Sequence, residues 1–219
     1  MGVYIFGAGG HAKVVVSTLL AEGQEVVGLF DDDPRKWGTY VFGVPVVGPI
    51  AKARDFPPGS GVVALGDNRL RAKLVGDFPD WEWIVTVHPR AYVDPSATLG
   101  PGTVVFAGAI VQAGARLGAH VIINTGVTVD HDCSLENFVH VAPGANLGGG
   151  VWVEEGALVG IGAAVIPGVR IGAWSIVGAG AVVIRDVAPG STVAGVPARP
   201  LPRRKNHERE DPDVCSGHH

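Results

Sequence analysis

Between residues 87 and 183, aliphatic side chains return at every sixth position of the chain. Stepping by six from Val87 to Val183 gives seventeen positions, and each of them holds valine, leucine or isoleucine. The residue four places after each position is small or β-branched. Glycine fills ten of the seventeen positions that lie one residue before this small side chain. The period is therefore six residues and keeps its register throughout.

A period of six residues predicts a stack of short strands joined by tight corners. Side chains alternate along a strand, so one large aliphatic and one small residue can point inward from each hexad. Glycine near each corner allows backbone angles that other residues resist. Short strands of this kind wind into a parallel β-helix, in which each coil packs on the previous one.

Residues 1–86 lack the six-residue period and instead alternate strand-like and helix-like segments. This alternation predicts a small, mostly parallel α/β sheet, with a core separate from that of the β-helix. The expected strands are "VYIFGAGG", "EVVGLFDDD" and "GVVALGD", and the expected helices are "HAKVVVSTLLAEG" and "NRLRAKLVGDF". We therefore expect a first domain over 1–86, a β-helix over 87–192 and a C-terminal segment over 193–219, which is rich in proline and charge and largely disordered at its end.

The net charge, the cysteine content and the distribution of apolar residues limit the kinds of partner and the cellular compartment that we expect. The net charge is −4, which argues against a nucleic-acid partner. The only two cysteines, Cys133 and Cys215, lie far apart, which fits a reducing cytoplasm better than a disulfide framework. No secretory signal is recognised at the N-terminus, and no apolar run reaches the length of a membrane span. We expect a cytoplasmic protein with no membrane partner.

The first strand runs into a glycine-rich turn, "GAGGHAK". Gly7, Gly9 and Ala12 satisfy G-x-G-x-x-A, and Asp31 follows about twenty residues later, as in dinucleotide-binding folds. Such a turn lets a phosphate approach backbone amides at a helix N-terminus, although a tight turn that binds nothing has the same pattern. A Rossmann-like domain of this length is too short for both halves of a dinucleotide site, so a single nucleotide is favoured.

Further polar residues follow the predicted strands at the same edge of the sheet. Open α/β sheets bind ligands at the carboxyl ends of their strands. His11 follows the glycines and could donate to a phosphate, while a carboxylate after the second strand could accept from a ribose or a base. The candidate substrate-binding residues of this domain are Gly9, Gly10, His11, Asp31, Asp32, Gly66 and Asn68.

The combination of these motifs resembles one branch of a known family. A "GAGGHAK" start, "FDDD", "LGDN" and hexads carrying "NTGVTVDHDC" are similar to the hexapeptide-repeat acyltransferases that acetylate sialic acids or nucleotide-linked amino sugars. The resemblance covers roughly residues 2–200. It implies a left-handed β-helix with three strands per coil, although crossovers are usually right-handed. It also implies nucleotide-sugar binding by the first domain, and acetyl-CoA bound along the β-helix between the subunits of a trimer.

An Asp-His-Asp cluster interrupts the apolar tract. Val129 and Cys133 are the inward residues of this hexad, so His131 between them should point outward. Histidine is suited to take a proton from an attacking amine at neutral pH, and a carboxylate on its other nitrogen would raise its basicity. The resemblance assigns this pair to His131 and Asp132. A solvated turn histidine is the alternative interpretation.

Other candidate residues follow from the spacing and from the resemblance. Gly149 lies eighteen residues after His131 and should stack against it, where its N–H could stabilise an oxyanion. The resemblance places Asn124 near the substrate. It places His140, Gly149, Ile161 and Ala179 at the cofactor, with Ala179 where some relatives have glycine. His88 and His120 are interpreted as structural.

These observations favour an acetyl-CoA-dependent enzyme that acetylates the amino group of a nucleotide-linked 4-amino-4,6-dideoxy sugar, with no metal. O-acetylation of a sialic acid or a related sugar would use the same residues. A γ-type carbonic anhydrase would need three histidines on one zinc ion, and His120, His131 and His140 lack the spacing we associate with that family. A scaffold without catalysis would leave the Asp-His-Asp cluster unexplained.

Overall fold

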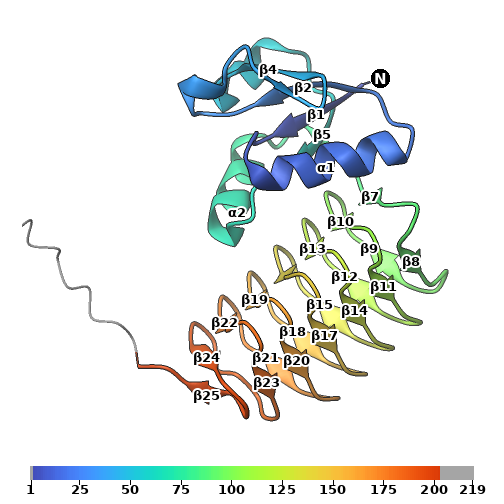
Figure 1. The fold of residues 1–219 in the computed structure, drawn as a ribbon, viewed down its shortest axis with the longest axis vertical. Coiled ribbons are helices and arrows are strands. Elements are labelled where there is room, and N and C mark those ends of the chain that lie inside the picture. The colour runs from blue at the N-terminus through green and yellow to red at the C-terminus, as the bar shows by residue number, and fades with distance from the viewer. Residues whose placement is uncertain (1, 203–219) are drawn as a thin grey trace, which may run out of the picture.

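The computed structural model describes residues 2–202 and has two parts, an α/β domain and a β-helix, arranged one above the other in Figure 1. The C-terminal tail that the sequence predicts to be disordered lies almost wholly outside the described residues. Within the described range, no helix is long and apolar enough to cross a membrane.

The N-terminal domain is a six-stranded sheet in the order β3-β4-β2-β1-β5-β6, parallel except for β3. The alternation of strands and helices expected from the sequence is confirmed, with an additional β3–β4 hairpin. The strands are β1 (Val3–Phe6), β2 (Val26–Phe30), β3 (Tyr40–Val41), β4 (Val44–Gly48), β5 (Ser60–Val63) and β6 (Glu82–Trp83). The helices are α1 (Gly10–Ala21) and α2 (Asn68–Asp77), with short 3-10 helices at Pro34–Lys36 and Ile50–Asp55.

The second part is a left-handed parallel β-helix with three sheets. The first sheet contains β7 (Thr86–Val87), β10 (Val104–Val105), β13 (Ile122–Ile123), β16 (His140–Val141), β19 (Leu158–Val159), β22 (Ile176–Val177) and β24 (Thr192–Ala194), with β25 (Arg199–Pro200) antiparallel at its end. The second contains β8 (Tyr92–Val93), β11 (Ile110–Val111), β14 (Thr128–Val129), β17 (Asn146–Leu147), β20 (Ala164–Val165) and β23 (Val182–Val183). The third contains β9 (Thr98–Leu99), β12 (Arg116–Leu117), β15 (Ser134–Leu135), β18 (Trp152–Val153) and β21 (Arg170–Ile171).

Each coil contains three hexads. Val105 pairs with Ile123, and Val111 pairs with Val129, so residues eighteen apart lie on neighbouring coils. Three rows of corners join the sheets. We call them the first corner (residues 124–127 and equivalents, between the first and second sheets), the second corner (130–133 and equivalents, between the second and third) and the third corner (136–139 and equivalents, between the third and first).

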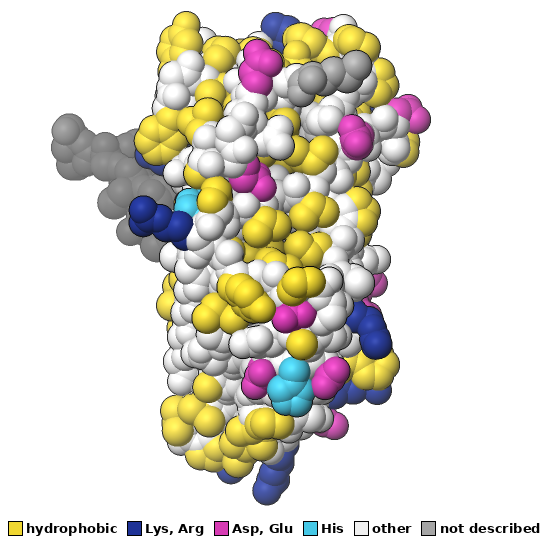
Figure 2. All heavy atoms as spheres, turned by 90° about the vertical axis from the view of Figure 1, so that its right-hand side faces the viewer, with side chains coloured by type: hydrophobic (Ala, Val, Ile, Leu, Met, Phe, Trp, Pro, Cys, Tyr) yellow, Lys and Arg dark blue, Asp and Glu magenta, His cyan; other side chains and the backbone are white. Residues whose placement is uncertain are grey.

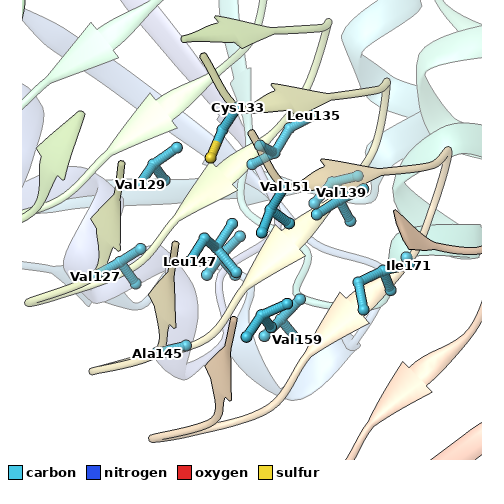
Figure 3. Close-up of a cluster of buried hydrophobic side chains, with 14 of the residues drawn as sticks. Val127, Val129, Cys133, Leu135, Val139, Ala145, Leu147, Val151, Val159 and Ile171 are labelled. Atoms are coloured by element: carbon cyan, nitrogen blue, oxygen red, sulfur yellow. The ribbon is translucent and has the colours of Figure 1, made fainter. Parts of the chain in front are cut away.

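The hexad pattern arises because the inside of the coil is a packed column of side chains. Figure 3 shows aliphatic residues from several coils, with the small Cys133 among them. Cys133 is fully buried, and this burial raises the pKa of its thiol, which suits an inert core residue. At four corners a non-glycine residue adopts the left-handed backbone region that glycine takes elsewhere: His120, Asp132, Phe138 and Trp174. At these four positions the backbone is strained, because residues with a side chain disfavour the left-handed region.

The two parts do not have fully separate cores, so that expectation is wrong. One buried cluster combines α1 residues such as Val15 and Leu19 with Val104, Phe106 and Ile122 of the β-helix. Outward positions on a β-helix face are usually solvated, but α1 lies against the first sheet (Figure 1), and these apolar residues are covered by it. The N-terminal domain is thus fixed to the β-helix by hydrophobic packing.

Candidate active site

His131 lies at the second corner, between β14 and β15, and points away from the core as expected. Its side chain is 64% exposed. The imidazole Nδ1 lies 2.9 Å from Oδ2 of Asp132, and the backbone N–H of His131 donates to Oδ1 of Asp130. Because a carboxylate can only accept, the Nδ1 nitrogen carries the hydrogen, and Nε2 is left as the basic atom.

Two carboxylates raise the pKa of His131 above its ordinary value. The hydrogen bond that His131 donates to Asp132 is the larger cause, and the charge of Asp130 adds to it. A base with a raised pKa accepts a proton more strongly, which favours abstraction from an amine. Asp132 adopts the left-handed backbone region, with φ of 59°.

Gly149 stacks on His131 from the next coil. A Cβ built at Gly149 would lie 2.6 Å from Nε2 of His131, so only glycine leaves room for the ring in this position. Among the three glycines of "LGGGV", Gly148 and Gly150 donate their N–H groups to backbone carbonyls. Within residues 2–202, the N–H of Gly149 has no such partner. The N–H of Gly149, on a residue packed against the His131 ring, is thus available to donate to the oxyanion of a tetrahedral intermediate.

Gly149→Ala should therefore displace the His131 ring while leaving the coil folded. We expect kcat to fall by about 10–100-fold, because small misplacements of reacting groups carry penalties of this size. Steady-state kinetics with saturating acetyl-CoA measure the effect. Gly126→Ala is a matched control at another corner, where a Cβ would meet nothing, although its φ of 66° adds backbone strain. Equal losses of kcat in the two variants would show that packing against His131 is not the cause.

A second polar group lies between the N-terminal domain and the first sheet. His140 Nδ1 is 3.3 Å from the carbonyl of Gly66, and its Nε2 is 3.2 Å from Nδ2 of Asn124. Since Asn124 Oδ1 already accepts from the N–H of Thr125, its amide nitrogen faces His140. Nε2 of His140 therefore accepts and Nδ1 donates.

His11 completes this second group. Its ring lies edge-on to Phe106 and 6.3 Å from the ring of His140. Burial, followed by the charge of Arg71, lowers the pKa of both histidines to about 4. The same two causes lower the pKa of His120 to about 4. These rings are neutral at pH 7, and Nε2 of His11 is buried with no partner among the described residues.

The glycine turn opens onto a separate hollow of about 300 Å³, lined in part by Gly7, Asp31 and Asp32. Asp31 Oδ2 accepts from the N–H of Ala8 and from Lys36, which ties the turn to the end of β2. Burial acts to raise the pKa of Asp31, but these hydrogen bonds outweigh it and the pKa is lowered. Asp32 accepts from the N–H of Ile50.

The open side of the turn is formed by Gly9 and Gly10. A Cβ at either residue would meet no atom within 4 Å, and Gly9 offers no side chain to cap α1. By contrast, a Cβ at Gly7 would lie 2.9 Å from the carbonyl of Ala64. Gly7 is therefore required by packing, whereas Gly9 and Gly10 leave the first-turn N–H groups of α1 open to an anion.

The candidate residues of the β-helix corners lie on two different edges of the β-helix. Ile161, which is 61% exposed, and Ala179 lie on the first corner, as does Asn124. His131 and Gly149 lie on the second corner. The second sheet separates these two edges within one chain.

Sequence reasoning gave no role to Arg71, although it stands in a helix of the expected site. Arg71 is a residue of α2, and it is buried. Asn68 lies beside it, and its amide nitrogen donates to the carbonyls of Gly156 and Ala157. Asn68 therefore contacts the β-helix, and its predicted contact with substrate would compete with these bonds. The only signal for Arg71 was a cation in an otherwise ordinary amphipathic helix.

The histidines considered for a zinc site do not converge. His120 lies buried on the third corner, His131 lies exposed on the second corner, and His140 lies on the first sheet. Within residues 2–202, no group of three or more His, Cys, Asp or Glu side chains is placed to hold a metal ion.

Comparisons with known proteins agree with this architecture. Residues 2–78 match the family model described as PglD N-terminal domain. The chain spans 24% of the length of one curated relative. It spans 67% of the length of another, the GDP-perosamine N-acetyltransferase of Escherichia coli O157:H7. The two are 31% identical over a region that covers 64% of this chain.

Two solved structures are similar over nearly the whole chain. One is PerB from Caulobacter crescentus in complex with CoA and GDP-perosamine, with 46% identity, a TM-score of 0.87 and coverage of 92% of this chain and 98% of that one. The other is the acetyltransferase domain of PglB from Neisseria gonorrhoeae in complex with acetyl coenzyme A, with 41% identity, a TM-score of 0.86 and coverage of 91% and 98%.

Proposed function

The chain belongs to the hexapeptide-repeat acetyltransferases, in the branch of nucleotide-linked amino-sugar N-acetyltransferases, and from this we propose how it works. It is a sugar N-acetyltransferase with acetyl-CoA as co-substrate. Our proposal is that the acceptor is a nucleotide-linked 4-amino-4,6-dideoxy sugar and that His131 is the general base. The observation that carries it is the His131–Asp132 pair packed against Gly149, whose N–H has no backbone partner within residues 2–202.

The reaction we propose is direct attack. The sugar amine adds to the thioester carbonyl of acetyl-CoA while Nε2 of His131 takes a proton from its nitrogen. Asp132 holds the ring through Nδ1 and stabilises the imidazolium that forms. The N–H of Gly149 stabilises the oxyanion of the tetrahedral intermediate, which collapses with departure of the CoA thiolate and leaves an amide.

The nucleotide part of the acceptor is proposed to bind at the hollow of the N-terminal domain. Its phosphates would approach the open N-terminus of α1 at Gly9 and Gly10, and Asp31 and Asp32 would face the ribose or the base. His140, Asn124, Ile161 and Ala179 are proposed to contact the pantetheine arm or the sugar. The free thiol of Cys133 in the core is compatible with a cytoplasmic enzyme.

We propose that the protein is a homotrimer. The two groups of candidate residues lie on different edges of one β-helix, so a site that contains both needs the first corner of one copy beside the second corner of another. Figure 2 shows hydrophobic side chains gathered on the side of the molecule that carries the second sheet, and Tyr92 and Ile110 of this sheet are exposed. Such apolar residues suit an interface between copies.

Light scattering should therefore report a trimer at the protein concentration used in assays. A control is the same measurement after Ile110→Asp, which places a charge on the second sheet and should favour smaller species. A wild-type monomer with full activity would contradict a site shared between subunits.

The substrate is tested with a panel of UDP-, GDP- and dTDP-linked 4-amino-4,6-dideoxy sugars, with acetyl-CoA, following CoA release. We expect one nucleotide to give a kcat/KM well above the others, and the matching 4-hydroxy sugar nucleotides to give no CoA release. Release of CoA with the hydroxy sugars, and not with the amino sugars, would contradict N-acetylation and favour an O-acetyltransferase.

A further inference from the structure

Arg71 is a buried cation that forms no ion pair with a carboxylate among residues 2–202, although the charge of the nearby Asp67 acts to raise its pKa. Only 1% of the residue is exposed. Its guanidinium donates from Nε to the carbonyl of His120, from Nη1 to the carbonyl of Leu65, and from Nη2 to the carbonyl of Phe138 and to Oδ1 of Asn68. All four acceptors are neutral, and burial lowers the pKa of Arg71 to about 10, so the group stays charged at pH 7. Burying a charge without an opposite charge beside it is costly, so the position of Arg71 requires an explanation.

The acceptors of Arg71 belong to both parts of the molecule. Leu65 and Asn68 belong to the N-terminal domain, whereas His120 and Phe138 are third-corner residues on two neighbouring coils. Both corner residues adopt left-handed backbone angles, and their rings stack at 5.4 Å between centroids. The guanidinium therefore joins one helix of the N-terminal domain to two successive coils of the β-helix.

Neighbouring residues extend this contact along the same corner. Asn68 reaches the next coil at Gly156 and Ala157, and Arg69 lies over the ring of Trp174 on the coil after that. The start of α2 thus follows the third corner across four coils. Figure 1 shows α2 on the side of the N-terminal domain that faces the β-helix.

The opposite side of α2 lines the nucleotide hollow. Leu70, Lys73 and Leu74 form part of its wall, together with Leu65, whose carbonyl is bound by Arg71. A single buried side chain therefore contacts the wall of the hollow at one end. At the other end it contacts the third corner of two coils, one of which carries His131 at its second corner.

We propose that Arg71 is a positioning residue, which sets the placement of the nucleotide hollow relative to the β-helix so that the sugar amine reaches the transfer site. This inference rests on the proposed function, because it needs an acceptor held at both ends. An acceptor anchored by its nucleotide reaches the thioester only if the hollow lies at a fixed distance from the transfer site on the β-helix. A shift of about an ångström in a reacting group can lower the rate by about 100-fold.

The planar fork of arginine is what allows four acceptors in different directions to be held at once. Lysine keeps the charge but offers one compact ammonium, which cannot reach the carbonyls of His120, Phe138 and Leu65 together. The substitution Arg71→Lys therefore separates the geometry of the side chain from its charge. Arg71→Met, which removes both, is a second variant.

The test compares two acceptors in the wild-type protein and in Arg71→Lys. One acceptor is the nucleotide-linked amino sugar, and the other is the methyl glycoside of the same amino sugar, which the hollow does not hold. We expect kcat for the nucleotide-linked acceptor to fall by about 10–100-fold. Three quantities should stay within about threefold of their wild-type values. They are the rate with the glycoside, the Kd of acetyl-CoA and the Kd of the free nucleoside diphosphate (GDP, UDP or dTDP).

Arg69→Met is the matched control. It removes a cation from the same helix that also touches the β-helix, but from an exposed position, and it should leave kcat for both acceptors within about threefold. Circular dichroism verifies the fold of each variant.

Two results would overturn the inference: an unchanged kcat for the nucleotide-linked acceptor in both Arg71 variants, or equal losses of rate with the two acceptors. If the wild-type protein acetylated neither acceptor, the proposed function itself would be wrong.

Discussion

Replacing His131 with alanine should lower kcat for the amino-sugar nucleotide by roughly 10²–10⁴, the usual contribution of a general base. The side chain points into solvent and packs on nothing in the core, so the fold and the Kd values of both substrates should stay close to those of the wild-type protein. Steady-state kinetics with saturating acetyl-CoA provide kcat, and calorimetry provides the two affinities.

His88→Ala is the matched control for this substitution. His88 lies on a β-helix corner, where its Nδ1 accepts from the N–H of Arg90, and it takes no part in the proposed site. The His88→Ala substitution should leave kcat within about threefold of the wild-type value. Turnover in His131→Ala equal to that of His88→Ala would show that the base lies elsewhere, or that the amine arrives already deprotonated.

Asp132→Asn extends the same test to pH. The carboxylate raises the pKa of His131, so its removal should lower that pKa. The base then stays unprotonated to lower pH, and the acidic limb of the kcat profile moves to lower pH, while the plateau falls less than in His131→Ala. Asparagine tolerates the left-handed backbone at this corner, which keeps the coil intact. If the acidic limb of the kcat profile does not move, Asp132 does not raise the pKa of the catalytic base.

Phe106→Ala should lower the free energy of unfolding by about 3–5 kcal/mol, the range typical of a buried phenylalanine. Phe106 is fully buried between the first sheet and the N-terminal domain, where it also contacts the ring of His11. Its removal leaves a cavity at the place where the two parts share a core. Urea denaturation at fixed protein concentration measures the loss.

Phe42→Ala is the control for this experiment. Phe42 is 63% exposed on the N-terminal domain, and its substitution should cost less than about 1 kcal/mol. A loss below about 1 kcal/mol in Phe106→Ala as well would mean that the interface relaxes around the missing ring, and that the two parts are held together mainly by polar contacts such as those of Arg71.

Much of the β-helix was predictable because its pattern is one-dimensional. Each coil contacts only its neighbours, so the spacing of Val129, His131 and Cys133 alone decides which side chain points inward. The same eighteen-residue repeat placed Gly149 against His131, and the built Cβ at Gly149 meets that ring.

The relation between the two parts was not predictable in this way. Val104 and Ile122 occupy outward positions, and the repeat does not reveal that α1 covers them. The partners of Arg71 in the β-helix are backbone carbonyls, which every residue carries and which leave no trace in the sequence. Likewise, the spacing along one chain does not reveal the shared site that we propose between the first corner of one copy and the second corner of another.

Acetyl transfer to nitrogen is tested most directly by identifying the bond in the product. The wild-type protein is incubated with isotopically labelled acetyl-CoA and the nucleotide-linked 4-amino sugar that gives the highest kcat/KM, and the sugar product is examined by NMR. We predict an amide on the amino nitrogen of the sugar, formed at a rate that falls with His131→Ala and not with His88→Ala. An acetyl ester on a sugar hydroxyl, or release of CoA without any acetylated sugar, would contradict this.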